Sequence, residues 1–334
     1  MKQFCAYLTI GLFSVFTLPT LAQSASTPLL SLMDQQKFRV VQTEIDKITN
    51  YQQQADLVLL KAKAMYSLRQ AKPLEQWMEK VLTDHPTHAQ LHYIAAMNKF
   101  SLAQEANIFS AAGLAKEGLS LLKQAAALDP ADLEIQRGLI GFYTSAPSIA
   151  GGDTEEAARL ITSLTSKDPV QGTLEQARLL ANDEKRQEAQ DLIEQQLQSH
   201  PNNVDLLTLK AALLSLKDDN NTAFALYQQC AELADNADDK YASLYQLGRL
   251  AAAKNQDAAI GIRSLEQYLS FYQDSDNRQL AWAKLRLAQI HFSQQDFAKA
   301  TQLVQQLRLE KDQQEKFTDE LKAFEKQLKK VKTS

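Results

Sequence analysis

The sequence has few of the residues that interrupt helices: ten glycines and eight prolines occur among its 334 residues. An all-β chain of this length needs many tight turns, and α/β folds usually contain more glycine. The scarcity therefore favours long helices joined by short connections. Alanine, leucine, glutamine, lysine and glutamate, all strong helix formers, are abundant instead. An apolar content of 45% excludes a chain that is disordered throughout.

A surplus of basic residues is also missing, since 36 lysines and arginines face 40 aspartates and glutamates and the formal net charge is −4. The composition therefore gives no reason to expect nucleic acid as a partner. The chain lacks the glycine-rich nucleotide motifs, the Gly-x-Ser-x-Gly elbow and a cysteine–histidine pair suited to nucleophilic catalysis. Its carboxylates are spread over polar helix faces without a distinct acid–base pair. We expect neither an enzyme nor a bound cofactor.

The N-terminus has the pattern of a secretory signal peptide over residues 1–22. Lys2 supplies a positive charge, residues 4–18 are almost wholly apolar, and small residues precede a cleavage site expected after Ala22, with Ala25 as the alternative. The apolar stretch is shorter than the ~20 residues of a membrane span, which disfavours the alternative of an uncleaved anchor helix. We expect a periplasmic protein without a transmembrane segment in its mature chain.

Cysteine is nearly absent, and only two cysteines occur. Cys5 lies upstream of the expected cleavage site, so it is lost with the signal and no lipoprotein is expected. Cys230 then remains alone in the mature chain, which excludes an intrachain disulfide. Its place in a helical pattern favours a buried thiol over a reactive one.

Residues 281–312 carry the clearest copy of an internal repeat. Its small and bulky positions are Leu287, Ala288, His291, Ala300, Val304 and Leu307. This order resembles the tetratricopeptide repeat, with His291 in place of the usual tyrosine and Asp312 where proline is common. The same register can be laid over most of the chain, where four units end at Pro86, Pro130, Pro169 and Pro201.

The resemblance implies an all-α fold: a right-handed α-solenoid (superhelix) of about six tetratricopeptide-like helical hairpins with capping helices at both ends. Small residues let the two helices of a hairpin approach closely, and bulky residues fill the space between hairpins. We expect a signal peptide at 1–22, N-terminal capping helices at 23–54, a repeat domain at 55–314 and a C-terminal capping helix and tail at 315–334. Another α-solenoid or an irregular helical bundle is the alternative.

The expected terminal helix has one apolar stripe opposite lysines and glutamates. The stripe consists of Phe317, Leu321, Phe324, Leu328 and Val331. A solvated capping face explains the lysines, and a membrane-surface or partner-docking segment is the alternative.

Two units depart from the period. Residues 100–116 make one unit about ten residues too long but remain helix-friendly, so we expect two lengthened helices. Residues 144–152 form a glycine- and proline-containing loop, after which Asp153 is expected to cap a helix and Glu156 to complete a capping box. A functional loop would offer backbone N–H groups beside the helix start to an anion or a peptide end. The loop candidates are Ser145, Pro147, Gly151, Gly152 and Asp153.

The resemblance also implies a concave groove lined by the first helix of each hairpin. The family's inward positions fall here on aromatic, charged and methionine side chains, which binding surfaces favour. The candidates are Asp56, Lys63, Tyr66, Tyr93, Met97, Phe100, Glu134, Arg137, Asp205, Tyr245, Arg249, Trp282, Gln289 and Phe292. The alternative is that several rings only pack between neighbouring first helices. The family's clamp for a carboxylate tail is incomplete, because Lys63 has no asparagine partner in register.

We therefore expect a non-catalytic periplasmic scaffold or adaptor that binds a peptide or helix of a cell-envelope protein in this groove. The alternative is a solute-binding accessory component of an envelope transport system, because similar loop insertions occur, by resemblance, in some bacterial tetratricopeptide proteins of periplasmic uptake systems. No metal site is expected, since His85, His88 and His92 have no further ligand at a useful offset.

Overall fold

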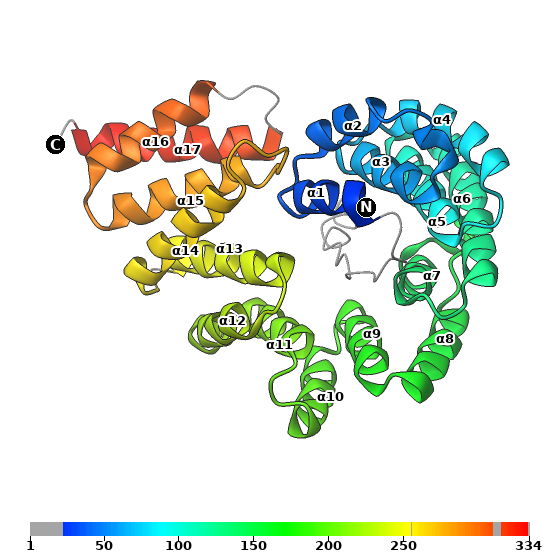
Figure 1. Cartoon of the computed structure of the whole chain (residues 1–334). Coiled ribbons are helices and arrows are strands. Elements are labelled where there is room, and N and C mark those ends of the chain that lie inside the picture. The colour runs from blue at the N-terminus through cyan, green and yellow to red at the C-terminus, as the bar shows by residue number, and fades with distance from the viewer. Residues whose placement is uncertain (1–22, 255, 310–314, 333–334) are drawn as a thin grey trace. The chain divides into compact units, whose positions relative to one another are not determined.

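The computed structural model describes residues 23–254, 256–309 and 315–332, and this part of the chain contains helices and no strand (Figure 1). The predicted all-α fold is confirmed. The expected signal peptide at 1–22 and Asp312 of the last repeat lie outside the described residues.

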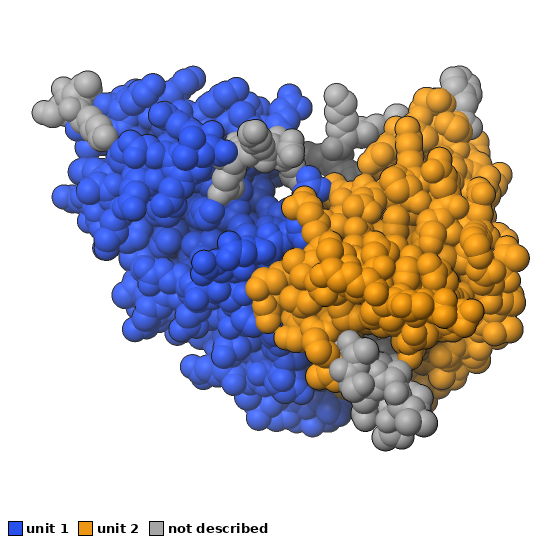
Figure 2. Space-filling model, turned by 45° about the horizontal axis from the view of Figure 1, so that its top comes forward, with its two compact units in different colours: residues 1–20, 197–334 blue, residues 21–196 orange. Residues whose placement is uncertain are grey.

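The chain divides into two compact units, which Figure 2 shows in separate colours. The first unit comprises residues 21–196, and the described residues from 197 onward belong to the second. The boundary falls inside helix α10 (Arg186–Ser199).

The first unit contains three hairpins in which consecutive helices pack together, namely α3 with α4, α5 with α6, and α7 with α8. Two helices precede the hairpins and α9 follows them. The bounds are α1 Gln23–Asp34, α2 Phe38–Asp46, the 3₁₀ turn η1 Tyr51–Gln53, α3 Ala55–Ser67, α4 Ala71–Asp84, α5 Ala89–Glu105, α6 Ile108–Leu128, α7 Leu133–Ser145, the 3₁₀ turn η2 Ser148–Ala150, α8 Thr154–Lys167 and α9 Pro169–Asn182.

The second unit contains three more hairpins, α11 with α12, α13 with α14, and α15 with α16, and α17 packs on both helices of the last one. The bounds are α11 Val204–Leu216, α12 Asn220–Leu233, α13 Ala237–Lys254, α14 Ala258–Phe271, α15 Leu280–Ser293, α16 Phe297–Leu309 and α17 Glu315–Lys332. The repeating helical hairpin that the sequence predicts is thus present in each unit.

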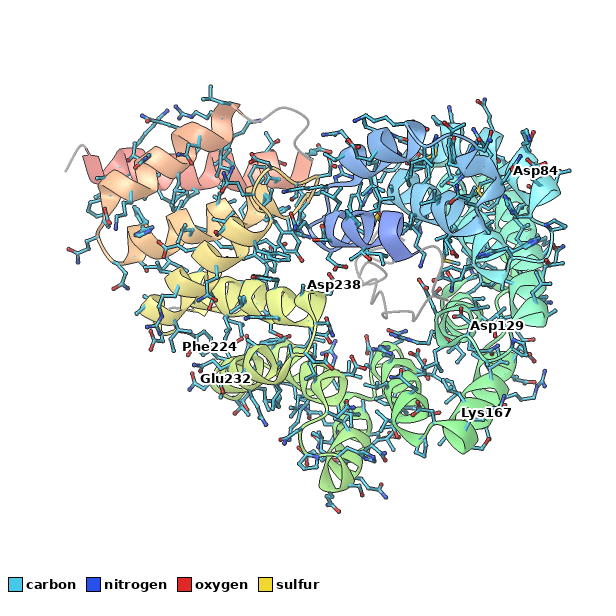
Figure 3. The ribbon with its side chains drawn as sticks, viewed as in Figure 1. Asp84, Asp129, Lys167, Phe224, Glu232 and Asp238 are labelled. Atoms are coloured by element: carbon cyan, nitrogen blue, oxygen red, sulfur yellow. The ribbon has the colours of Figure 1, made fainter. Side chains whose placement is uncertain are left out.

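Helix ends follow the proline signals of the sequence. Figure 3 shows Asp84, Asp129 and Lys167 where α4, α6 and α8 end, just before Pro86, Pro130 and Pro169. At the last of these ends Pro169 opens α9, as a residue without a backbone N–H can do at the first helical position.

The turns inside several hairpins are made without glycine. Arg69, Asp218 and Gln295 are each the middle residue of a three-residue connection and have φ values of 56°, 63° and 63°. The next backbone N–H donates back to a carbonyl of the preceding helix in each case: Gln70 to Met65 at 3.0 Å, Asp219 to Leu214 at 3.1 Å and Asp296 to His291 at 2.8 Å. This Schellman arrangement satisfies carbonyls that a helix end leaves open, which offsets the left-handed backbone cost of about 1–2 kcal/mol per residue.

Small residues allow the helices of a hairpin to approach closely. A Cβ built on Gly248 of α13 would lie 2.2 Å from Leu265 Cγ of α14, and one on Gly261 would lie 2.3 Å from the Ala251 methyl. Both distances are far below van der Waals contact, so α13 and α14 require glycine at these positions.

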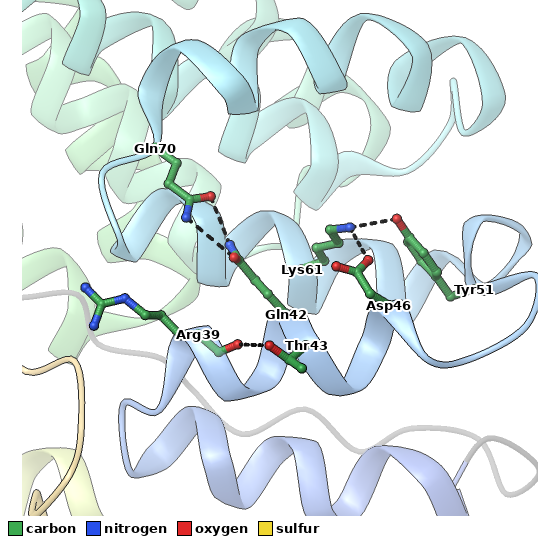
Figure 4. A network of polar contacts seen from close by, with 7 residues as sticks. All are labelled: Arg39, Gln42, Thr43, Asp46, Tyr51, Lys61 and Gln70. Carbon is green, nitrogen blue, oxygen red and sulfur yellow. Dashed lines mark hydrogen bonds and ion pairs between the residues drawn. The ribbon is translucent and has the colours of Figure 1, made fainter.

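Polar contacts join α2 to α3 at the start of the first unit (Figure 4). The Lys61 ammonium bonds to the Asp46 carboxylate and, at 2.7 Å, to the Tyr51 hydroxyl. The Gln42 amide donates to Gln70 at 3.1 Å. Beneath them Val41 and Ile45 of α2 are fully buried, so the polar contacts set the orientation of a helix that apolar packing holds.

Candidate functional site

The groove candidates all lie on the first helices of the hairpins. We name the surface that these residues form the first-helix face. All fourteen side chains are half-buried and none is fully exposed. The described face consists of residues on α3, α5 and α7 in the first unit and on α11, α13 and α15 in the second. Each unit carries its own part of this face.

In the first unit, Lys63 of α3 reaches across to Glu134 of α7, and the two charged groups are 3.8 Å apart. Tyr93 of α5 lies beside this pair, and its ring is 2.8 Å from the position that a Cβ on Gly138 would occupy. Burial raises the pKa of Tyr93, and the negative charge of Glu134 adds to the increase. Burial likewise raises the pKa of the Glu134 carboxyl, while Lys63 acts in the opposite direction.

A second ion-pair group on this face centres on Glu175 of α9, a residue that the sequence did not single out. Its side chain is 7% exposed and accepts a 2.9 Å hydrogen bond from the Arg137 Nε. Arg178, one turn along α9, bonds to the same carboxylate oxygen. One buried carboxylate therefore holds two guanidinium groups, and its i,i+3 spacing to Arg178 is the only sequence signal for it.

The remaining candidates of the first unit are partly used in packing. Tyr66 and Tyr93 pack against the core cluster around α3 to α5, and Met97 packs against the next one. Phe100 stacks on Phe142 with ring centroids 4.8 Å apart, so it joins α5 to α7. The sequence alternative, in which rings fill the space between first helices, describes Phe100 well.

In the second unit, α17 covers the first-helix face of α15. Trp282 meets Phe317 edge-on with centroids 5.0 Å apart, and Phe292 meets Phe324 at 5.5 Å. Phe317 and Phe324 are 2% and 4% exposed, so this contact is a closed apolar interface. Two of the predicted groove rings are therefore occupied by the chain's own terminal helix.

A polar contact sits between these aromatic pairs. The Glu320 carboxylate of α17 accepts from Arg286, a residue that sequence reasoning missed, and at 3.2 Å from the Gln289 amide. Burial acts to raise the pKa of Glu320, but the Arg286 hydrogen bond and charge outweigh it and the pKa lies below its ordinary value. Arg286 also stacks over the Trp282 ring at 5.1 Å.

The face of α13 has no such cover from α17. Tyr245 is half-buried against Tyr268, with ring centroids 5.4 Å apart, and burial raises its pKa. Arg249, one turn on, donates from its Nε to the Gln246 side chain at 2.6 Å. Asp205 lies in the first turn of α11 on the same unit.

The loop candidates form a tightly bonded turn. The N–H groups of Ala150, Gly151 and Gly152 donate to Pro147, Ser148 and Pro147 carbonyls, and Ser145 Oγ donates to Gly141 at 2.6 Å. Gly151 has φ 104°, and a Cβ on Gly152 would lie 1.8 Å from the Ala146 carbonyl oxygen, so both glycines serve the turn itself.

The start of α8 after this loop confirms half of the expected cap. The Asp153 carboxylate accepts from the N–H groups of Glu155 and Glu156 at 3.1 and 3.0 Å. The prediction that Glu156 accepts a hydrogen bond from the Asp153 N–H is wrong. That N–H donates to the Tyr143 carbonyl, and the Glu156 carboxylate pairs with Arg159. The donors that an anion would need at this helix start are therefore already in use.

The glycine-containing loop packs against the lengthened helix α6. The long insertion forms the lengthened helices α5 and α6, as predicted. Ala150 of the loop is buried, and a Cβ on Gly151 would lie 3.0 Å from Leu119 of α6. Beside this contact lies an open hollow of about 590 Å³, which the sequence did not reveal. Its lining residues are Leu119, Lys123, Tyr143, Gly151, Gly152, Asp153, Glu156 and Arg159.

The cysteine and the histidines that were considered for reactivity or metal binding make structural contacts. Cys230 is fully buried, as predicted, and Thr208 donates to its sulfur at 3.4 Å. His85 and His92 bond to the carbonyls of Gln52 and Pro86. Across the described ranges, no group of three or more histidine, cysteine or carboxylate side chains could hold a metal ion. Within the same ranges, none of the helices combines the length and the apolar character needed to cross a membrane.

No protein-family model and no curated protein matches the chain. Solved structures are similar to it in fold. A chain of the APC/C hetero-tetramer Cut9–Hcn1 matches 89% of it at 14% identity with a TM-score of 0.47, and 55% of that chain is covered, so this protein spans about half of its length. A tetratricopeptide repeat protein from Parabacteroides merdae matches 78% of this chain and 95% of its own, at 13% identity and a TM-score of 0.44.

A third similar structure is PilF of Pseudomonas aeruginosa, with 17% identity, a TM-score of 0.38, and coverage of 66% of this chain and 92% of its own. The described helices form tetratricopeptide-like hairpins. That architecture follows from the paired helices, the glycine contacts and the short connections of this chain, because likeness at these identities and TM-scores carries no argument by itself. The assemblies in which these similar proteins occur are properties of those proteins and are not transferred to this chain.

Proposed function

We propose that this protein is a non-catalytic interaction scaffold whose first-helix face binds a peptide or helix of a partner protein. The observation that carries the proposal is the seat of α17 on α15, where aromatic pairs and a shared carboxylate hold an amphipathic helix on that face. The chain thus contains an example of the kind of element that such a face accepts. A helix face with half-buried aromatic and arginine side chains suits helix or peptide recognition.

A peptide-display selection tests this function. A library of random linear peptides is selected against the full chain, and binding of the enriched peptides is measured by calorimetry. We expect Met97→Ala to weaken peptides that bind the first unit, or Tyr245→Ala to weaken peptides that bind the second, by about tenfold or more, as truncation of an interface anchor does. The matched control is Leu128→Ala on the second helix α6, which is 40% exposed. A selection without binders, or binders indifferent to the face variants, would contradict the proposal.

A second candidate function is solute binding in the hollow beside the loop. The hollow is open and polar, and Lys123 and Arg159 on its walls could attract an anionic solute. The test is thermal protection of the chain by a panel of amino acids, sugars and small carboxylates. Lys123→Ala should abolish any protection. Replacing Gly152 would not be informative, because a Cβ there would collide with the Ala146 carbonyl.

The proposed site of action is the periplasm, and the proposed partner is a protein of the cell envelope. Both rest on the signal-peptide pattern of residues 1–22. Cell fractionation and N-terminal sequencing of the protein from cells test this part. We expect a periplasmic protein that begins at Gln23, and a cytosolic protein that begins at Met1 would refute it.

A further inference from the structure

Three of the five histidines of the chain lie at the connection between α4 and α5, in residues 85–92, which we name the histidine turn. His85 directly follows α4, His88 directly precedes α5, and His92 lies in the first turn of α5. Backbone bonds join the three residues: the His88 N–H donates to the His85 carbonyl at 3.3 Å, and the His92 N–H donates to the His88 carbonyl at 3.4 Å. Three imidazole rings therefore share one short segment of the first unit.

Two of these rings hold the histidine turn in place through hydrogen bonds. His85 Nε2 lies 2.8 Å from the carbonyl oxygen of Gln52 in η1, and His92 Nε2 lies 2.9 Å from that of Pro86. A carbonyl oxygen can only accept, so each Nε2 carries a proton and donates it. The His92 side chain is deeply buried, and its Nδ1 meets no hydrogen-bond partner among the described residues. The turn is thus tied to η1 and to its own backbone.

The third ring, that of His88, occupies a place that suits only its neutral form. Its Nδ1 is buried and has no hydrogen-bond partner within the part of the chain that the structure describes. In a charged imidazole both nitrogens carry protons, so Nδ1 would become a buried charged donor without an acceptor. His88 also stands at the N-terminus of α5, where the helix dipole disfavours a cation.

The surroundings of His88 disfavour the charged ring on balance. Burial, the largest effect, lowers the pKa of His88, and the other two histidines of the turn lower it further. Asp56 of α3 acts in the opposite direction without outweighing them. On α4, Lys80 and Asp84 beside His85 form an ion pair with each other. The closed turn therefore binds a proton at His88 less tightly than a ring in water does.

We propose that the histidine turn is an acid-sensitive latch, in which protonation of the His88 ring releases the start of α5. A released ring titrates near about 6.5 and a closed one below it. The closed turn is therefore fully stable above that pH and opens as the pH falls through the closed value. The latch goes beyond the scaffold function, because α5 carries Tyr93 and Met97 of the first-helix face.

Hydrogen exchange of the full chain between about pH 7.5 and about pH 5 tests the latch. Rates are corrected for the direct effect of pH on chemical exchange. We expect protection in the first turns of α5 to fall by up to about tenfold per pH unit below about 6.5, since opening takes up one proton. His88→Gln, which keeps a neutral polar side chain, should abolish this loss. The matched control is His200→Gln at an exposed histidine of the second unit, which should respond like the unaltered chain.

A second variant leaves His88 in place and tests the same point if His88→Gln does not fold. Asp56→Asn removes the charge that favours the protonated ring. The closed turn then binds the proton even less tightly, so acidification should cost more protection than in the unaltered chain. An NMR titration of the histidine ring signals adds a direct readout, and the signal that is missing in His88→Gln should have its midpoint below about 6.5.

The outcomes decide whether the latch exists. Equal losses of protection in His88→Gln and in the unaltered chain would place the acid response elsewhere and overturn it. Protection of α5 that stays constant on acidification would do the same, as would a His88 ring signal whose midpoint lies at or above about 6.5.

Discussion

The charged side chains of the first-helix face are paired differently in the two units. In the first unit, the cations Lys63, Arg137 and Arg178 meet carboxylates on the same face, either on another first helix or one turn along their own. In the second unit, Arg286 pairs with the carboxylate of Glu320 on α17. Arg249 donates to the Gln246 side-chain amide among the described residues. The hairpins of one unit thus carry cations paired with carboxylates of their own face, and those of the other carry a cation paired with an added helix.

This difference bears on which cations of the first-helix face could bind a carboxylate of a ligand. A cation paired within its own face has lost much of its attraction for a ligand, and a ligand carboxylate would have to displace a resident one. In the second unit, the carboxylate that Arg286 meets comes from a separate element, helix α17. The second unit therefore differs in having Arg249, a first-helix cation that meets an amide and no carboxylate among the described residues, although the hairpins of the two units follow the same design.

The largest effect is expected from removing the anchor of α17. Phe317→Ala should destabilise the α15–α17 contact by about 3–5 kcal/mol, because it empties a site where a ring is 2% exposed. Hydrogen exchange should then show lost protection in α17 and little change in the first unit, since repeats are coupled mainly to their neighbours. Leu309→Ala, at a side chain 82% exposed, is the control. Unchanged protection of α17 would mean that the helix is not held by this contact.

A smaller effect is expected in the first unit from Glu175→Gln. The amide keeps the shape but loses the charge that holds Arg137 and Arg178. The free energy of unfolding should fall by about 1–2 kcal/mol, discounted for guanidinium groups that are partly exposed. Urea denaturation measures it, with Glu79→Gln on the exposed side of α4 as control. Equal stability of both variants would show that the ion pairs of this face contribute nothing.

The smallest effect is a dependence on pH that distinguishes the units. The pKa of Glu320 is lowered in the folded chain, so its contribution is present above the ordinary carboxyl pKa and is lost as pH falls through the folded value. The stability advantage of the unaltered chain over Glu320→Gln should therefore shrink on acidification. Fluorescence of Trp282 in a Trp77→Phe background monitors α17 during the titration.

Glu134 in the first unit should give a dependence of stability on pH that has the opposite sign. Its pKa is raised, so the folded chain binds the proton more tightly and stability falls as pH rises through the raised value. Relative to Glu134→Gln, the unaltered chain should gain stability on acidification. The same slope for both sites would contradict the contrast between the faces.

The hairpins were predictable because their signals are local. The prolines after α4, α6 and α8 and Asp153 at its helix start act through nearby backbone, and Ala288 and Ala300 lie in the two neighbouring helices of one hairpin. The turns through Arg69, Asp218 and Gln295 were not, since their left-handed backbone occurs at non-glycine residues, of which only Asp218 is of a type enriched there. Their cost is met by carbonyl contacts that form only once the hairpin has closed.

The candidate site was predictable as a surface and not as a set of contacts. Helical register places Lys63, Tyr93 and Arg249 on first helices, but it cannot say which carboxylate a cation meets. Glu175, Arg286 and Glu320 escaped notice because a charged residue on a helix usually faces solvent. The contact of the loop at Gly151 with Leu119 of α6 was equally hidden, since each segment looked like an independent departure from the period.

The amino-acid sequence by itself determined that this chain forms short paired helices, because helix propensity, capping and small-residue spacing act over a few residues and need no distant partner. Only the tertiary structure decided which charges neutralise one another and which stay available, since ion pairs depend on distances of a few ångströms between helices that are far apart along the chain. The face of α15 filled by α17 and the face of α13 with Arg249 bound to an amide follow from that placement.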